Sequence, residues 1–119
     1  MFNQIEIHPF HQQWKFVDKL LKQDIQPIAW SPFAEGQNDI FSNSILSNIA
    51  KKHNKTVAQV ILRWLIQRNI IAIPRTSKIE RLRENIDIFD FQLTDKDMEQ
   101  IKLLDMGKSA FGYTMGYED

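Results

Sequence analysis

Hydrophobic and polar residues alternate over residues 2–7, a segment that reads FNQIEI. This period of two predicts a short strand, which Pro9 ends. Two apolar runs predict two further strands, at residues 27–30 and at residues 70–73. The last run is continuously apolar, which is typical of a parallel strand that is covered on both faces.

The segments between these strands carry hydrophobic residues at helical spacing. Thr56 and Gln59 form a capping box, which predicts a buried helix that runs to about Arg68. Residues 77–80 resemble a second capping box, and Thr94 is placed to cap the last helix. The predicted helices cover residues 12–23, 45–54, 57–68, 78–85 and 95–104, with a polar loop at residues 36–42.

The predicted order is therefore β-α-β-αα-β-α-α. Short apolar strands separated by helices predict parallel strands joined by right-handed crossovers. Three such strands cannot close a barrel, and a three-stranded parallel sheet leaves two unpaired edges. The pattern thus predicts part of a larger α/β fold over residues 1–106, followed by a glycine-containing tail loop at residues 107–119.

Composition narrows the functional classes. The 119 residues contain 15 Lys plus Arg and 15 Asp plus Glu, so the chain has no basic excess for nucleic acid. It has no cysteine, which excludes disulfides and thiolate chemistry. Apolar runs are too short for a membrane span, and residues 1–4 carry no secretory signal, so we expect a cytoplasmic protein.

The segment IPRTSKIERLREN at residues 73–85 is the most informative about function. It predicts a strand end, a tight turn and a helix N-terminus with cationic side chains around it. Helix N-termini bind phosphate groups, and Arg75 and Arg81 add charge-assisted donors. The alternative is an ordinary βα turn whose arginines are solvated.

This segment resembles the I-P-K-S-x-x-x-x-R-I-x-E-N signature of the aldo-keto reductase family. Residues 3–9 (NQIEIHP) are similar to that family's N-Q-x-E-x-H-P strand, and residues 29–33 (AWSPF) to its Y/W-S-P-L strand ending. The three motifs stand in family order, from about Phe2 to Asp105. Residues 57–64 (VAQVILRW) also resemble a helix of bacterial diketogluconate-reductase-like members.

The resemblance implies the C-terminal portion of a TIM (β/α)8 barrel, about three of its eight βα units. It also implies hydride transfer from a nicotinamide cofactor, usually NADPH, that reduces an aldehyde or ketone to an alcohol. The family's catalytic Asp, Tyr, Lys and His belong to earlier strands, and no motif here matches them. We therefore expect no catalytic residue in this chain. Tyr113 and Tyr117, its only tyrosines, are not assigned as general acid.

By the same resemblance, the nicotinamide end of the cofactor falls on the first two strands. Trp30 stands where an aromatic ring stacks on the nicotinamide, and Gln4 matches the side chain that binds the carboxamide. Ser31 and the backbone after Pro32, including Phe33, fall in the loop that holds the pyrophosphate. Phe33-Ala34 replaces the family's Leu-Gly here.

The adenosine end falls on residues 73–85. Arg75 and Thr76 match the family's Lys and Ser that hold the 2′-phosphate. Both replacements keep a hydrogen-bond donor, but arginine and lysine differ in the geometry of their donors. Arg81 matches the arginine that packs on adenine. Glu84 and Asn85 match residues near the adenine edge.

Each residue also has a structural interpretation. Trp30 could simply pack at the barrel mouth without binding a cofactor, and Gln4 could simply satisfy buried backbone groups. Asn85 could be a left-handed helix cap. His8 and His11 form an H-x-x-H pair, but Pro9 prevents their sharing a helix, so no metal site is predicted.

Two rival functions remain open. One is a truncated, inactive nucleotide-binding or assembly fragment, and the other is a non-catalytic relative of the channel-associated kind. The expected partners are a small carbonyl substrate and a complementary N-terminal fragment or a second copy, paired through the open strand edges. We expect neither nucleic acid nor membrane as a partner.

Overall fold

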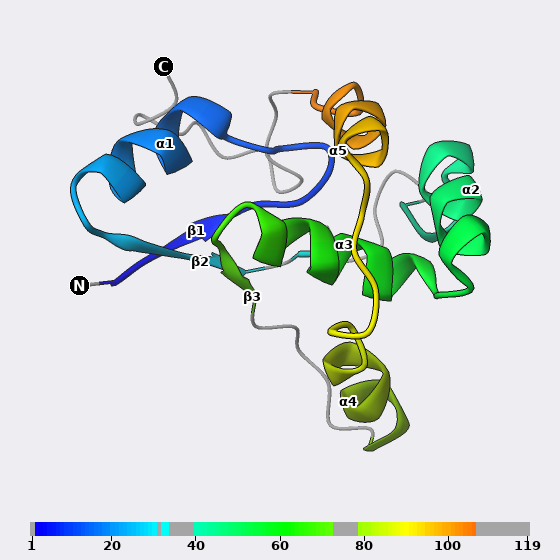
Figure 1. Ribbon diagram of the computed structural model, residues 1–119. Helices are drawn as coiled ribbons and strands as arrows, with labels where there is room; N and C mark the ends of the chain where they lie inside the picture. Colours follow the sequence, from blue (N-terminus) through cyan, green and yellow to red (C-terminus); the bar gives the residue numbers. More distant parts are fainter. Residues whose placement is uncertain (1, 31, 34–39, 73–78, 107–119) are drawn as a thin grey trace.

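The structure is a computed structural model that describes residues 2–30, 32–33, 40–72 and 79–106, of which residues 79–82 are described by their backbone. The elements follow the predicted order (Figure 1). They are β1 (Phe2–Glu6), α1 (Trp14–Lys22), β2 (Gln26–Trp30), α2 (Ser44–His53), α3 (Val57–Gln67), β3 (Ile71–Ala72), α4 (Ile79–Ile86) and α5 (Asp95–Lys102).

The three strands form one parallel sheet in the order β1-β2-β3, which confirms the predicted parallel arrangement. The register pairs Gln4 with Ile28, Ile28 with Ile71, and Glu6 with Trp30. The carboxyl ends of the strands therefore meet at one edge of the sheet. Within the part of the chain that the structure describes, no other strand pairs with β1 or β3.

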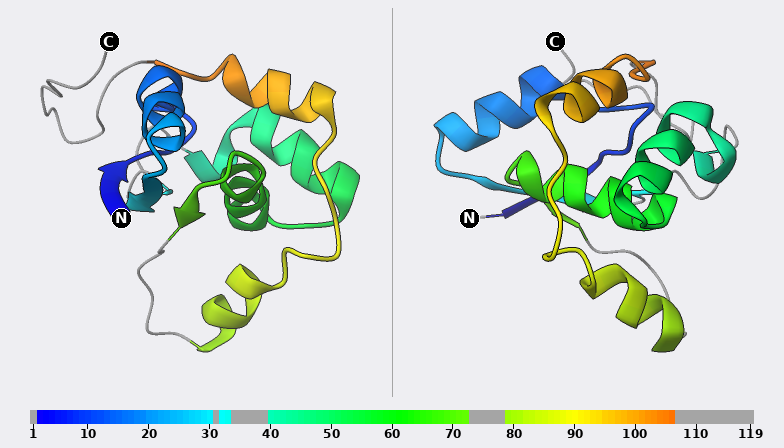
Figure 2. Two further views of the ribbon diagram at one scale, coloured as in Figure 1. Left: turned by 60° about the vertical axis from the view of Figure 1, so that its left-hand side comes forward. Right: turned by 45° about the vertical axis from the view of Figure 1, so that its right-hand side comes forward.

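Helices cover one face of this sheet, as the left view of Figure 2 shows. Ile5 and Ala29 point into the core on that face, where Val17 of α1 and Leu65 of α3 join them. Since side chains alternate along a strand, the opposite face carries Phe2, Gln4 and Glu6 of β1, Gln26, Ile28 and Trp30 of β2, and Ile71 of β3. Glu6 is buried on this face, and five of the accessible residues are Phe2, Gln4, Ile28, Trp30 and Ile71. We call these five residues the open face.

Side-chain caps set the helix starts that the sequence predicts. The Thr56 hydroxyl accepts a hydrogen bond from the backbone N–H of Gln59, whose side chain in turn accepts from the N–H of Thr56. The same reciprocal box joins Thr94 and Asp97 at the start of α5. Both predicted caps are confirmed, and each satisfies backbone donors that a helix start leaves without partners.

Three details differ from the expectations. Trp14 is only half-buried, and the Arg68 guanidinium and the Lys102 ammonium lie 3.8 Å and 4.8 Å from the centre of its ring. Ile40, in the loop expected to be polar, is fully buried. The helix α4 continues to Ile86, so Asn85 is not a left-handed cap.

The expected cap at residues 77–80 begins outside the described residues. The whole tail at residues 107–119 lies outside them. The division into a partial barrel at residues 1–106 and this tail stays a prediction. The helix α4 lies apart from the sheet, beyond α3, in every view (Figures 1 and 2).

Candidate functional site

Gln4 and Trp30 share the open face at neighbouring positions of β1 and β2. Gln4 pairs with Ile28, and Trp30 lies two residues further along the same strand. The Gln4 side chain is exposed and Trp30 is half-buried. The structure therefore places an amide and an indole ring on one accessible surface.

Glu6 and His8 form a buried ionisable pair where β1 ends. Both side chains are fully buried, and His8 Nε2 lies 2.8 Å from Glu6 Oε2. The backbone N–H of Phe10 donates to His8 Nδ1 over 3.3 Å, so Nε2 carries the proton that the Glu6 carboxylate accepts. Burial lowers the pKa of His8, although Glu6 opposes this, and the imidazole is neutral.

Sequence reasoning missed this pair. It placed Glu6 correctly on the strand face that carries Gln4, but it considered His8 only as a metal ligand and did not pair the two. The available signal was a glutamate two residues before a histidine on one strand face, followed by Pro9, because that spacing puts both side chains on one side. In the described part of the chain, no three His, Asp or Glu side chains gather as a metal site would require.

In the segment after β2, Pro32 is buried and Phe33 is half-buried. The Phe33 ring lies 5.6 Å from the ring of Phe41, at a tilt of 54°. This contact joins the start of the connection between β2 and α2 to its end. Ser31, expected in the pyrophosphate loop, lies outside the described residues.

The helix α4 carries three of the residues expected at the adenosine end. Glu84 and Asn85 lie in its last two turns and are half-buried. The Glu84 carboxylate accepts a hydrogen bond of 2.7 Å from the Thr56 hydroxyl, so in this structure it faces the start of α3. Arg81 lies on the same helix.

Arg75 and Thr76 lie outside the described residues, between β3 and α4. Tyr113 and Tyr117 lie in the tail, which is also outside them. Among the helices of the described ranges, none has the length and apolar character that crossing a bilayer requires.

The sequence profile described as "Aldo/keto reductase family" matches residues 1–105. The chain is 48% identical over 104 residues to glyoxal reductase of Bacillus subtilis strain 168, covering 87% of this chain and 37% of that relative. More generally, it spans 32% to 40% of the length of three curated relatives that it matches.

Solved structures agree with this match. An aldo-keto reductase from a Medee basin deep-sea metagenome library superimposes with a TM-score of 0.87 at 41% identity, over 91% of this chain and 40% of that one. The silkworm (Bombyx mori) aldo-keto reductase AKR2E5 complexed with NADPH gives a TM-score of 0.85 at 35% identity, over 92% of this chain and 36% of that one. The α/β fold is thus about three of the eight βα units of the barrel, its C-terminal portion.

Proposed function

Because this chain belongs to the aldo/keto reductase family, we propose that it forms the cofactor-binding side of an NADP-dependent oxidoreductase. The proposed reaction reduces aldehydes or ketones to alcohols by hydride transfer. The placement of Gln4 and Trp30 on one accessible face carries this proposal, with Trp30 at the carboxyl end of β2, the end of the strands at which such barrels hold their ligands.

The residues on the open face fit a nicotinamide. The Trp30 indole offers a flat apolar surface on which the ring can stack. The Gln4 amide has both a donor and an acceptor, which match a carboxamide. When bound, the cofactor supplies the hydride. Trp30 and Gln4 would fix which face of the ring is presented.

The adenosine end is proposed for α4 and the turn before it. Arg75 and Thr76 would meet the 2′-phosphate, Arg81 would pack on adenine, and Glu84 and Asn85 would line its edge. The fixed plane of an arginine presents two donors to a phosphate group. Ser31 and Phe33 would border the pyrophosphate.

We place no proton donor among these 119 residues, and we expect the chain alone to be inactive. The second candidate, a nucleotide-binding or assembly role without catalysis, is favoured by the apolar residues on the open face. Phe2 is 70% exposed and Ile71 47% exposed there. A complementary N-terminal segment or a second copy would cover them. The cytoplasm is the proposed location, and a small carbonyl compound the proposed substrate.

Tryptophan fluorescence with NADPH tests the site directly in the full-length protein. NADPH is expected to quench the fluorescence, and Trp30→Ala is expected to weaken binding about 3- to 10-fold through the lost stacking. Trp14→Phe is the matched control, since Trp14 lies on α1 away from the open face. Unchanged NADPH affinity in Trp30→Ala would contradict the assignment.

Turnover separates the two candidate functions. NADPH oxidation with a panel of aldehydes and diketones is expected for the full-length protein, and no oxidation for material shown by mass to be these 119 residues. Turnover by that shorter material, surviving repurification, would show that a proton donor within the chain was overlooked.

A further inference from the structure

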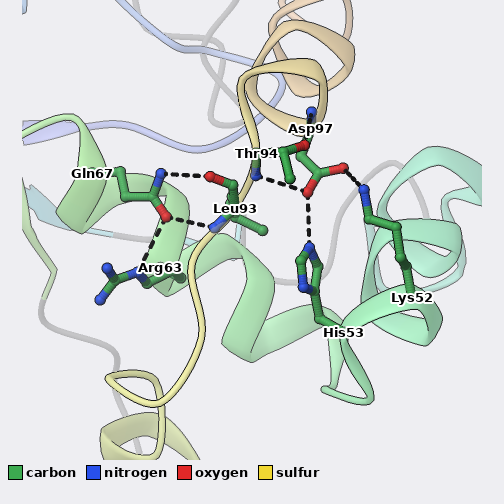
Figure 3. Close-up of polar contacts among 7 residues, drawn as sticks. All are labelled: Lys52, His53, Arg63, Gln67, Leu93, Thr94 and Asp97. Atoms are coloured by element: carbon green, nitrogen blue, oxygen red, sulfur yellow. Dashed lines mark hydrogen bonds and ion pairs between the residues drawn. The ribbon is translucent and has the colours of Figure 1, made fainter.

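A stripe of polar side chains runs along one side of α3 and holds the backbone of residues 84–93. Gln59, Arg63 and Gln67 recur at helical spacing and each donates to a carbonyl of that segment. Gln67 also accepts from the N–H of Leu93 over 2.8 Å, as Figure 3 shows. The stripe therefore fixes the path of the chain from the end of α4 to the start of α5.

At the end of this stripe, the C-terminus of α4 meets the N-terminus of α3. The Gln59 side-chain amide donates to the carbonyl oxygens of Glu84 at 3.0 Å and Asp87 at 3.3 Å, while the Thr56 hydroxyl donates to the Glu84 carboxylate. The Glu84 carbonyl also accepts from the backbone N–H of Asp87 over 3.2 Å, so the Gln59 amide adds a second donor where α4 ends. The opposite partial charges of the two helix ends also attract.

Lys55 adds the positive charge at this junction. Its Nζ lies 2.8 Å from Asp90 Oδ1 and 3.5 Å from Asp87 Oδ2, and it donates to the Asp87 carbonyl over 3.2 Å. The Lys55 side chain is only 10% exposed and passes within 5.3 Å of the Phe91 ring. The hydrogen bond to Asp90 raises the pKa of Lys55 and lowers that of Asp90, so both remain charged at neutral pH.

Apolar burial contributes little to this end of α4. Ile86 is 70% exposed and Phe89 is 71% exposed, whereas Ile88 is buried. Because α4 lies apart from the sheet (Figure 1) and packs on α3, the polar contacts of Lys55, Thr56 and Gln59 help to set where its last turn lies.

We propose that Lys55 is a positioning residue for the adenosine end of the cofactor site, acting through its contacts with Asp87 and Asp90 at the end of α4. The inference rests on the proposed function, which assigns Arg81, Glu84 and Asn85 of that helix to adenine. Lys55 itself touches no cofactor in this assignment. Its role is to hold α4 where those side chains meet the adenosine.

The test compares whole and partial cofactors with the full-length protein. Calorimetric or fluorescence titration would use NADPH, adenosine 2′,5′-bisphosphate and reduced nicotinamide mononucleotide. Lys55→Met is expected to weaken the binding of NADPH and of the bisphosphate by the same factor, about 3- to 10-fold. This is the effect expected from the loss of one partly buried charge contact. The mononucleotide, which has no adenosine, is expected to bind unchanged.

Matched variants complete the design. Lys55→Arg keeps the charge and is expected to restore binding, and Asp90→Asn is expected to reproduce the loss without adding to that of Lys55→Met. Lys22→Met is the control, because the Lys22 side chain is 78% exposed and pairs with Asp18 on α1. Asp90→Asn also serves as the test if Lys55→Met fails to fold.

Equal weakening of all three ligands would show a general structural defect and overturn the inference. Unchanged NADPH affinity in Lys55→Met and Asp90→Asn would overturn it too, while leaving the proposed function standing. A wild-type protein that binds no NADPH would overturn both.

Discussion

His53, the last residue of α2, donates from Nε2 to the Asp97 carboxylate of α5 over 2.8 Å (Figure 3). The acceptor is Oδ2, which also receives the backbone N–H of Thr94 at 3.0 Å. Lys52 binds the other carboxylate oxygen. One buried carboxylate, 1% exposed, thus caps α5 and joins it to the end of α2.

Acid is expected to weaken this junction. Burial opposes the ionisation of Asp97, but hydrogen bonds from His53, Lys52 and Thr94 prevail and lower its pKa to about 2. A carboxyl whose pKa is lower when folded than when unfolded stabilises the fold above the unfolded pKa, near 3.9. That contribution, at most about 2.5 kcal/mol, is therefore expected to disappear as the pH falls from about 4 to about 2.

Urea unfolding of wild type and Asp97→Asn across this range measures the effect. The variant is expected to be less stable at pH 6 and to approach the wild type near pH 2. Asp18→Asn is a suitable control, since Asp18 is 69% exposed in its pair with Lys22. A stability difference for Asp97→Asn that does not change with pH would contradict this account.

A second pH dependence is expected from His8. Because burial lowers its pKa in the folded protein, the unfolded chain binds a proton more readily below about pH 6.5. Stability is therefore expected to fall as the pH drops below that value, by up to about 1.4 kcal/mol per pH unit. Chemical unfolding at several pH values between 5 and 8 checks this.

His8→Gln keeps a side-chain amide that can still donate to Glu6, but it cannot titrate. The slope of stability against pH is expected to flatten in this variant. If His8→Gln retains the wild-type slope, another group is responsible.

Local sequence patterns predicted most of the fold. Thr56 and Thr94 predicted helix starts because a cap depends on residues three positions apart. The parallel sheet followed from short apolar strands separated by helices, and the burial of Ile5 followed from alternation. These features depend on neighbours within one turn or one strand.

Contacts between distant segments were not predicted. Lys55 meets Asp87 and Asp90 only once α3 and α4 are packed together, and no pattern marks such a pair. Trp14 had the spacing of a core residue, yet it is half-buried and its ring contacts two cationic side chains. For the candidate site, the motifs indicated Gln4 and Trp30, while the register that joins them came from the structure.

The 119-residue chain alone is expected to self-associate. The open face exposes Phe2 and Ile71, and β1 and β3 have unpaired edges among the described residues. Light scattering is expected to show species larger than a monomer, and a Phe2→Lys, Ile71→Lys double variant is expected to reduce them. Leu103→Lys, which changes an 80% exposed residue at the end of α5, is the control. A compact wild-type monomer with a sharp cooperative melt would contradict the expectation.

Arg75 is expected to set the preference for NADPH over NADH in the full-length protein. The 2′-phosphate distinguishes the two cofactors, and an arginine before a helix N-terminus would meet it with two donors. Arg75→Met is therefore expected to weaken NADPH binding by about 1.5–3 kcal/mol, about 10- to 150-fold, with little change for NADH. Arg81→Ala is expected to weaken both, because both contain adenine. Fluorescence titration of both cofactors at fixed ionic strength measures this, and an equal loss of both affinities in Arg75→Met would show that another residue binds the 2′-phosphate.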